Sequence, residues 1–260
     1  MKISFEFERQ EIDTVKDFVA HKLNSNRRFV QSRLQQNVLG STPIIDDDKL
    51  WLAILMCLLT TQQRSGPNSP INLFLERRPF QLTLNDCKEF NSLEKSAFDL
   101  LNNAKGIRRT NKIAKAISGN FRMLNEGEWD NLRDWRDKLI LQRQTSPNLS
   151  HRELEEKASN YMEHFIEFGP KQSRNFWQSL GLTRYVFVLD SRILRWLRQY
   201  LKIQNGVLTG QGLGDVQYYQ FISDLLLNLC IQANVLPCVL DAAIFDSFDE
   251  GKEWSSETIW

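Results

Sequence analysis

The 260-residue sequence lacks the residue patterns that mark disulfide-rich, metal-binding or nucleotide-binding proteins. Its 4 cysteines stand at no zinc or iron–sulfur spacing, and its 12 glycines and 7 prolines are few for this length. It contains no phosphate-loop or dinucleotide-binding glycine motif. We therefore expect free thiols in the reducing cytoplasm, with a nucleoid association if the source is prokaryotic, and no metal or cofactor.

Long hydrophobic runs are also missing. The longest, residues 50–59, has ten residues, whereas a transmembrane helix needs about 18 or more. We expect this run to form a buried core helix, and we expect no membrane association. Residues 1–7 are too short and too acidic to be read as a signal peptide.

The charges nearly cancel over the whole chain but are unevenly distributed. The 33 basic and 32 acidic residues give a net charge of +1. Basic residues dominate segments 105–115 and 171–202, and the last segment, 241–260, is acidic. One basic face could bind a phosphate backbone, although solvated helix faces give the same pattern.

Hydrophobic periodicity predicts a mostly helical chain with no βαβ unit, so the expected fold class is all-α. Residues 185–189 could form a short strand or an extended connector, and residues 206–214 a glycine-rich loop. The acids at 46–48 are expected to cap a helix, with a metal site as the alternative. The helices are expected near residues 16–34, 50–61, 91–104, 109–120, 129–141, 151–166, 171–180, 190–201, 218–229 and 235–245.

The strongest functional signal is a tight turn between two predicted helices, at residues 167–170. The second helix would begin with unpaired backbone N–H groups, which suit a DNA phosphate. Lys171 stands at that helix start, where the positive end of the helix dipole disfavours an ammonium. Asp190 follows at the start of the next helix, either as a plain N-cap or as a catalytic carboxylate.

Around these residues the sequence resembles the helix–hairpin–helix DNA glycosylases, particularly the second type of 8-oxoguanine glycosylase of bacteria and archaea. The matching residues are Gly169, Lys171, Ser173, Phe176, Gly181 and the run 188–195. The resemblance implies that Lys171 is the nucleophile and that Asp190 is the catalytic carboxylate.

Three weaker matches extend the resemblance along the chain. Residues 58–62 (LLTTQ) resemble the family's "LLSAQ", which implies that Gln62, or else Gln63, fills the gap left by a flipped base. Residues 106–114 resemble a segment that contacts the DNA backbone, and residues 240–245 resemble the closing helix. The expected DNA contacts are Gln62, Gln63, Arg108, Arg109, Lys112, Gly169, Ser173, Arg174 and Arg192.

The sequence also departs from the family pattern. Glu167 occupies the position of the hairpin's first glycine, and Arg192 stands where the relatives have histidine. No iron–sulfur cysteine set is present, which disfavours the endonuclease III subgroup.

The resemblance implies two helical lobes with a DNA-binding cleft between them. The central lobe would span residues 46–185 and end in the helix–hairpin–helix, 151–181. The other would combine 1–45 with 186–260 and carry the catalytic Asp190. We expect a monomer that binds double-stranded DNA containing a modified base.

The implied activity is excision of an extruded base, such as the oxidised purine 8-oxoguanine. Lys171 would attack the sugar and form a Schiff base, with strand nicking as a second step, while Asp190 stabilises the transition state. Phe176, Trp177 and Phe245 could stack on the base or pack in the core.

Three other interpretations remain open. The substrate could be a different modified base, such as a hypermodified phage pyrimidine, excised in anti-phage defence to leave abasic sites. The chain could instead be a non-catalytic DNA-binding module, or a helical scaffold with a chance hairpin.

Overall fold

The computed structural model of the chain describes residues 6–25, 27–201, 203 and 208–248. Within these residues the fold is all-α and contains no β-strand, which confirms the predicted class. The stretch 185–189 is an irregular connector and not a strand. Lys202, residues 206–207 of the predicted loop and residues 249–260 of the acidic segment lie outside the described residues.

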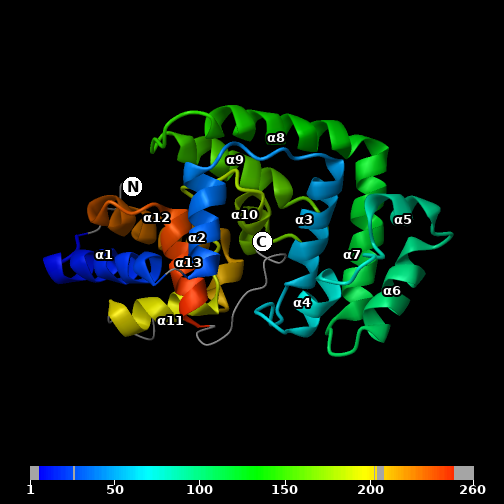
Figure 1. Cartoon of the computed structure of the whole chain (residues 1–260), viewed down its shortest axis with the longest axis horizontal. Helices are drawn as coiled ribbons and strands as arrows, with labels where there is room; N and C mark the ends of the chain where they lie inside the picture. The colour runs from blue at the N-terminus through cyan, green and yellow to red at the C-terminus, as the bar shows by residue number, and fades with distance from the viewer. Residues whose placement is uncertain (1–5, 26, 202, 204–207, 249–260) are drawn as a thin grey trace.

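The helices follow one another along the chain as labelled in Figure 1. They are α1 (Arg9–Asn24), α2 (Arg28–Leu34), the π-helical turn η1 (Gln35–Leu39), α3 (Asp47–Leu59), α4 (Pro70–Leu75), α5 (Leu84–Glu89), α6 (Leu93–Asn103), α7 (Thr110–Met123), the π-helical turn η2 (Leu124–Glu128), α8 (Trp129–Arg143), α9 (His151–Met162), α10 (Pro170–Ser179), α11 (Ser191–Tyr200), the 3-10 turn η3 (Gly212–Gly214), α12 (Val216–Ala233) and α13 (Pro237–Ser247).

Two features differ from the predicted helices. The single helix expected at 16–34 is two helices, because α1 ends at Ser25, whose hydroxyl and backbone N–H both donate to the His21 carbonyl. Helices α4 and α5 were not predicted. Each begins at an N-cap, Ser69 or Thr83, whose side-chain oxygen accepts a backbone N–H three residues further on.

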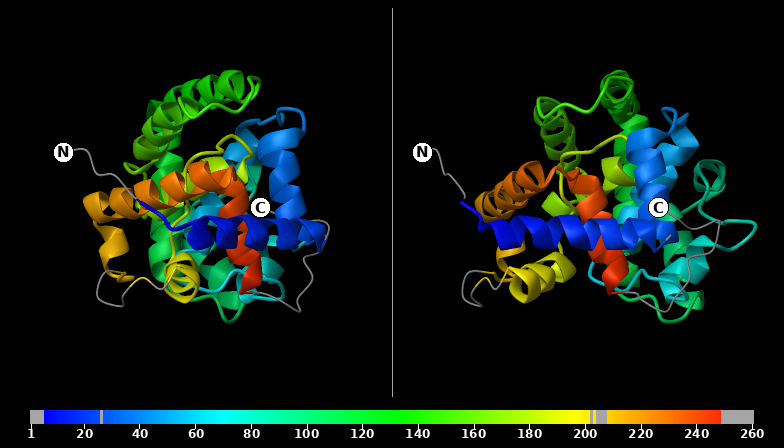
Figure 2. Two further views of the ribbon diagram at one scale, coloured as in Figure 1. Left: turned by 90° about the vertical axis from the view of Figure 1, so that its left-hand side faces the viewer. Right: turned by 60° about the vertical axis from the view of Figure 1, so that its left-hand side comes forward.

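The helices form two lobes with separate hydrophobic cores (Figure 1). The central lobe, α3–α10, has a core of residues between Ile45 and Leu182. The terminal lobe, α1, α2 and α11–α13, has a core of residues from Val15 to Val30 and from Phe187 to Ile244. Figure 2 shows α1 lying alongside the other terminal helices. Residues 183–190 carry the chain from one lobe to the other.

Helix α3 is the buried helix that the hydrophobic run predicts. Of residues 50–59, all except Leu52 are buried. The Asp46 carboxylate caps the helix by accepting the Lys49 N–H at 2.9 Å, and Asp47 pairs with Arg133 of α8 at 2.7 Å. Asp46 therefore caps the helix and Asp47 forms an ion pair, and no group of metal ligands occurs among the described residues.

The terminal lobe is closed by α12 and α13. The buried Asp246 of α13 pairs with Lys22 and Arg27, which joins α13 to α1 and to the start of α2. All four cysteines are free and buried. In the described part of the chain no single helix is long and apolar enough to span a membrane. Helices α12 and α13 together are long and apolar enough, but the angle between them is 104°.

Candidate active site

The hairpin between α9 and α10 has the expected tight geometry. Gly169 is the N-cap of α10 and Pro170 is its first residue. A Cβ at Gly169 would meet no atom within 4 Å, so the space beside this helix start is open. Glu167 adopts the left-handed conformation that glycine usually supplies, with φ of 66°.

One pocket between the lobes contains both predicted catalytic residues. Lys171 of α10 and Asp190, the N-cap of α11, line it together with Phe245 of α13. Its volume is about 60 Å³. The other lining residues are Phe29, Arg33, Met56, Thr60, Ser65, Asn175, Gln178, Val188, Arg192, Ile193, Asp241 and Ile244.

Asp190 is held by backbone and side-chain donors. Its Oδ1 accepts the N–H groups of Arg192 at 2.7 Å and Ile193 at 3.4 Å. Its Oδ2 lies 3.3 Å from the Arg192 guanidinium, which also lies over the Phe245 ring, 4.0 Å from its centroid. Asp190 is thus an N-cap and also a fixed carboxylate in the pocket, so the two interpretations of this residue are compatible.

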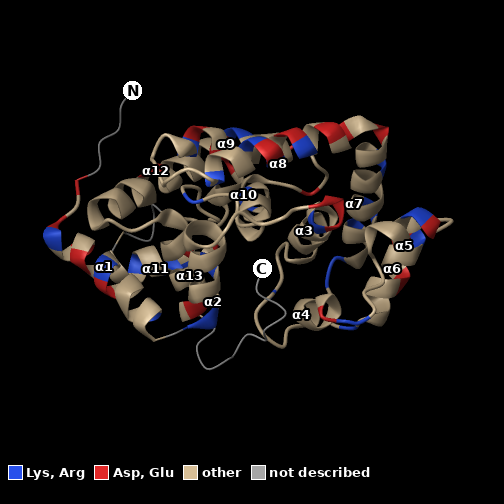
Figure 3. Cartoon of the chain, turned by 45° about the horizontal axis from the view of Figure 1, so that its top comes forward, with Lys and Arg blue, Asp and Glu red and all other residues tan. Residues whose placement is uncertain are grey.

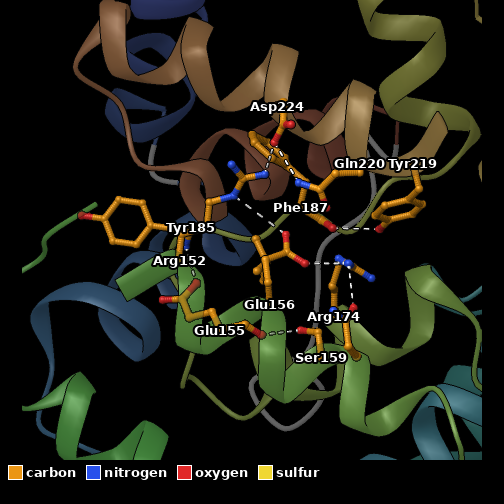
Figure 4. A network of polar contacts seen from close by, with 12 residues as sticks. Arg152, Glu155, Glu156, Ser159, Arg174, Tyr185, Phe187, Tyr219, Gln220 and Asp224 are labelled. Atoms are coloured by element: carbon orange, nitrogen blue, oxygen red, sulfur yellow. Dashed lines mark hydrogen bonds and ion pairs between the residues drawn. The ribbon is translucent and has the colours of Figure 1, made fainter. Parts of the chain in front are cut away.

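The extended chain that leads to Asp190 is held by buried polar side chains from both lobes (Figure 4). The Glu155 carboxylate of α9 accepts the N–H groups of Arg184 at 3.0 Å and Tyr185 at 2.7 Å. The Tyr219 hydroxyl of α12 donates to the Phe187 carbonyl and accepts the Leu189 N–H, at 2.8 and 2.9 Å. Burial raises the pKa of Glu155 to about 8, despite these two donors.

Arg174 joins this network to α10. Its guanidinium is buried, pairs with Glu156 at 2.6 Å and Glu163 at 3.3 Å, and lies 4.7 Å from the Tyr219 ring centroid. Arg152 and Asp224 extend the network to α12 (Figure 4). Arg174 stands one turn after Lys171, so the same network fixes the helix that carries the lysine and the segment that carries Asp190.

Four predicted contacts do not fit the structure. Ser173 and Arg174 are buried, so neither can touch a DNA phosphate as predicted. Phe176 and Trp177 are fully buried in the central core, so they pack there and cannot stack on an extruded base. For Ser173, Phe176 and Trp177 the reason is helical phase, because these positions face away from the side of α10 that carries Lys171. Arg174 is held inside by its two ion pairs.

The side of α10 that carries Lys171 also carries two pocket residues that the sequence comparison missed. Asn175 and Gln178 stand four and seven residues after Lys171, on the same side of α10, and both line the pocket. Counting positions i+4 and i+7 from the lysine would have found them. Asp241, within the matched segment 240–245, also lines the pocket although no role was predicted for it.

The predicted wedge and backbone-contact segments lie side by side. Gln62 follows the end of α3, is exposed and has a φ of 56°. Gln63 turns back, donating to the Leu59 carbonyl at 2.6 Å and accepting the Arg108 N–H at 2.9 Å. The Arg108 guanidinium in turn donates to the Gln62 carbonyl at 2.7 Å. Gln62, rather than Gln63, is therefore the side chain directed outward.

Glu167 connects the hairpin to the neighbouring basic segment. Its carboxylate pairs with Arg109 at 2.6 Å and Lys112 at 3.1 Å. Burial opposes ionisation of this group, but Lys112 and Arg109 outweigh it and hold the pKa of Glu167 below its ordinary value.

The charges on α8 have a different arrangement. This helix carries alternating acids and bases (Figure 3), as expected for a solvated face.

A second and larger cavity shares one lining residue with the pocket. It has a volume of about 670 Å³, runs along α3, and shares Met56 with the pocket. Leu52 and Ala53 form part of its apolar lining, and Arg78 and Asn85 contribute polar groups.

Comparisons with known proteins support the fold. No family profile matches the sequence, and no curated protein matches it. The structure is similar to the 8-oxoguanine DNA glycosylase of Methanocaldococcus jannaschii, with 17% identity and a TM-score of 0.60, over 94% of this chain and 95% of that one. It is also similar to Tm1821, the 8-oxoguanine DNA glycosylase of Thermotoga maritima, with 14% identity and a TM-score of 0.61, over 94% and 100%.

A third similar structure is the M. jannaschii 8-oxoguanine glycosylase/lyase in complex with a 15mer DNA that contains 8-oxoguanine. It shares 16% identity and a TM-score of 0.60 over 94% of this chain and 99% of that one. The chain therefore has the fold that the sequence resemblance implies, over nearly its whole length.

The two hydrogen bonds of the Tyr219 hydroxyl, to the Phe187 carbonyl and from the Leu189 N–H, form a clamp on the extended chain that gives a stability prediction. Tyr219→Phe removes the hydroxyl and leaves the buried Leu189 N–H without its partner, so we expect the free energy of unfolding to fall by about 1–3 kcal/mol. The neighbouring Tyr218 accepts an exposed N–H from Thr209, so Tyr218→Phe should cost less than about 1 kcal/mol. Urea unfolding measures both, and equal losses would contradict the clamp.

Proposed function

We propose that this protein is a DNA glycosylase that extrudes a modified base and excises it with Lys171 as the nucleophile. The observation that carries the proposal is the single pocket lined by Lys171 and Asp190, which come from different lobes. The similarity in fold to 8-oxoguanine DNA glycosylases, one of them bound to DNA, supports it. An oxidised purine such as 8-oxoguanine is the first substrate to test.

The chemistry follows from the two side chains. The Lys171 amine, once neutral, attacks C1′ of the sugar, and the base leaves with the electrons of its glycosidic bond. Positive charge develops on the sugar during this step, and the fixed Asp190 carboxylate is placed to stabilise it. The resulting Schiff base permits β-elimination, which would nick the strand.

The same face of the molecule is suited to duplex DNA. The open start of α10 at Gly169 would receive a phosphate on its unpaired N–H groups. Gln62 would enter the gap left by the extruded base. Arg108 and Lys112 would contact the backbone nearby.

Borohydride trapping tests the proposal. End-labelled duplexes carrying 8-oxoguanine, other oxidised bases or glucosylated hydroxymethylcytosine are incubated with wild type and Lys171→Gln. We expect a covalent protein–DNA band with one substrate, absent in Lys171→Gln, and excision slowed about 10³-fold or more because the nucleophile is gone.

Each other result has a defined meaning. Abasic sites without a trapped band would exclude a Schiff base and favour attack by water assisted by Asp190. Binding to every duplex without excision of any base would support the non-catalytic DNA-binding module.

Replacement of Glu167 tests the DNA-binding face. Glu167→Gly frees Arg109 and Lys112, and glycine tolerates the φ of 66° at this position. We expect several-fold tighter binding to an undamaged duplex, and a plot of log K against log salt that is steeper by about 1. Fluorescence anisotropy at several salt concentrations measures both quantities.

The control for this variant is Glu153→Gln, which removes an exposed carboxylate paired only with Lys157 on α9. It should change neither affinity nor salt dependence. An unchanged slope in Glu167→Gly would place the DNA elsewhere.

The large cavity favours a second candidate substrate. The pocket of about 60 Å³ and the cavity of about 670 Å³ share the lining residue Met56, and a bulky substituent on the extruded base would extend past Met56 into the larger space. We therefore also propose a hypermodified pyrimidine as the alternative target, in which case the activity would serve defence against phage.

Leu52→Trp distinguishes the two substrates. Leu52 lines the large cavity and is 44% exposed, so tryptophan can narrow the cavity without disturbing the core. For a bulky base we expect excision to fall at least about tenfold, whereas excision of 8-oxoguanine should be unchanged. Leu73→Trp, at an exposed position that lines neither cavity, is the control. Equal excision by Leu52→Trp and wild type on a bulky base would exclude this use of the cavity.

A further inference from the structure

A second carboxyl group lies in the catalytic pocket. Asp241 of α13 is 8% exposed and lines the same pocket as Lys171 and Asp190. Within the described part of the chain its side chain forms no hydrogen bond and no ion pair shorter than 4 Å. A nearly buried carboxyl with unused hydrogen-bonding capacity that opens into a pocket is available to a proton donor or acceptor there.

Charged groups on three helices face this carboxyl. Arg33 of α2, Lys171 of α10 and Arg192 of α11 favour its ionised form, whereas Asp190 opposes it. Burial is the largest influence, and together these effects raise the pKa of Asp241 to about 7. The Asp241 carboxyl also lies near the buried thiol of Cys238 on α13. Burial raises the pKa of this thiol to about 12, so that it stays neutral.

The two pocket carboxyls have opposite environments. The oxygens of Asp190 already accept two N–H groups and contact a guanidinium, which stabilise its charge. Asp241 has none of these donors and exchanges its proton near neutral pH. One carboxylate is held by fixed donors and the other has free hydrogen-bonding capacity, so the two can divide the work, one as a fixed charge and the other as an acid and base.

We infer that Asp241 is the proton-transfer residue of this pocket, which accepts a proton from the Lys171 ammonium and delivers it to the departing base. This role rests on the glycosylase function proposed above. In this assignment Asp190 only stabilises the positive charge that develops on the sugar, and Asp241 acts as both the base and the acid of the excision step.

The step balances with these groups alone. The Asp241 carboxylate takes one proton from the Lys171 ammonium, leaving a neutral amine. The amine lone pair forms the bond to C1′, and the C1′–N bond breaks with its electron pair going to the base. The protonated Asp241 then gives its proton to that base nitrogen, which regenerates the carboxylate as the base leaves neutral.

The test compares wild type, Asp241→Asn and Asp134→Asn, using the substrate that wild type excises. Single-turnover excision is measured from pH 5.5 to 9, and borohydride trapping is measured on a duplex with a preformed abasic site. We expect Asp241→Asn to slow excision about 100-fold at pH 7 and to lose the pH dependence centred near pH 7. Its band on the abasic duplex should be weaker at pH 7, because Lys171 must still lose a proton, and should recover at pH 9, where hydroxide can take that proton and no base has to be protonated.

Thermal unfolding provides an independent readout. A carboxyl whose pKa is raised on folding stabilises the protein at low pH and loses that contribution as the pH rises through about 7. Asp241→Asn should therefore unfold at a higher temperature than wild type at pH 8.5, and the difference should be clearly smaller at pH 5, nearer the unfolded pKa of about 3.9. Asp134→Asn, which removes an exposed partner of Lys138, should match wild type in every assay.

Three outcomes would overturn the inference. The first is a wild-type rate and pH profile in Asp241→Asn. The second is loss of trapping on the abasic duplex at every pH together with loss of excision, which would mark a structural role. In the third, wild type excises no base and traps no abasic duplex, so the proposed function fails and this role with it.

Discussion

The candidate site depends on how one extended segment, residues 184–190, is held between the lobes. Lys171 ends up opposite Asp190 only because the chain between them turns back along a fixed path. Glu155 fixes the start of that segment through two backbone N–H groups, and Tyr219 fixes its end through Phe187 and Leu189. Each of these bonds involves the backbone of the segment, and the buried side chains of Val186 and Phe187 add apolar packing.

This clamp is made of polar groups that are costly to bury. A buried charge pair often contributes little net stability compared with apolar residues of the same volume. The Arg174 guanidinium offsets its cost by pairing with two carboxylates and lying over the Tyr219 ring, so that α9, α10 and α12 share one network. Such a network specifies a single arrangement of the lobes, which matters more to a pocket lined by both lobes than added stability.

The sequence predicted the elements whose signals are local. The buried α3, the hairpin turn and the N-cap at Asp190 each follow from patterns within about ten residues, and the structure contains them. The failures at Ser173, Phe176 and Trp177 arose because residues were assigned without regard to helical phase. Arg174 is instead turned inward by its ion pairs with Glu156 and Glu163, which no local pattern shows. Asp241 could not be found in this way, because its proximity to Lys171 depends on how α13 packs against the other lobe.

Glu167 shows how a departure from a motif can be compensated by its neighbours. The left-handed backbone there costs a non-glycine residue roughly 1 kcal/mol or more. Two ion pairs of partly exposed groups return a comparable amount, because such pairs are worth about 0.2–1 kcal/mol each. The carboxylate therefore keeps the turn closed at little net cost, while it neutralises Arg109 and Lys112 beside the helix start.

The size of the pocket sets a requirement on any base that enters. A volume of about 60 Å³ is far below the several hundred Å³ typical of small-molecule sites. The contact between Arg192 and Phe245 lies at this pocket, and a cation–π pair of this kind is worth about 0.5–2 kcal/mol. Breaking it costs less than a few phosphate contacts contribute to DNA binding. A closed pocket in the free protein is thus compatible with base entry on the DNA, and Asp190 keeps its backbone donors when Arg192 moves.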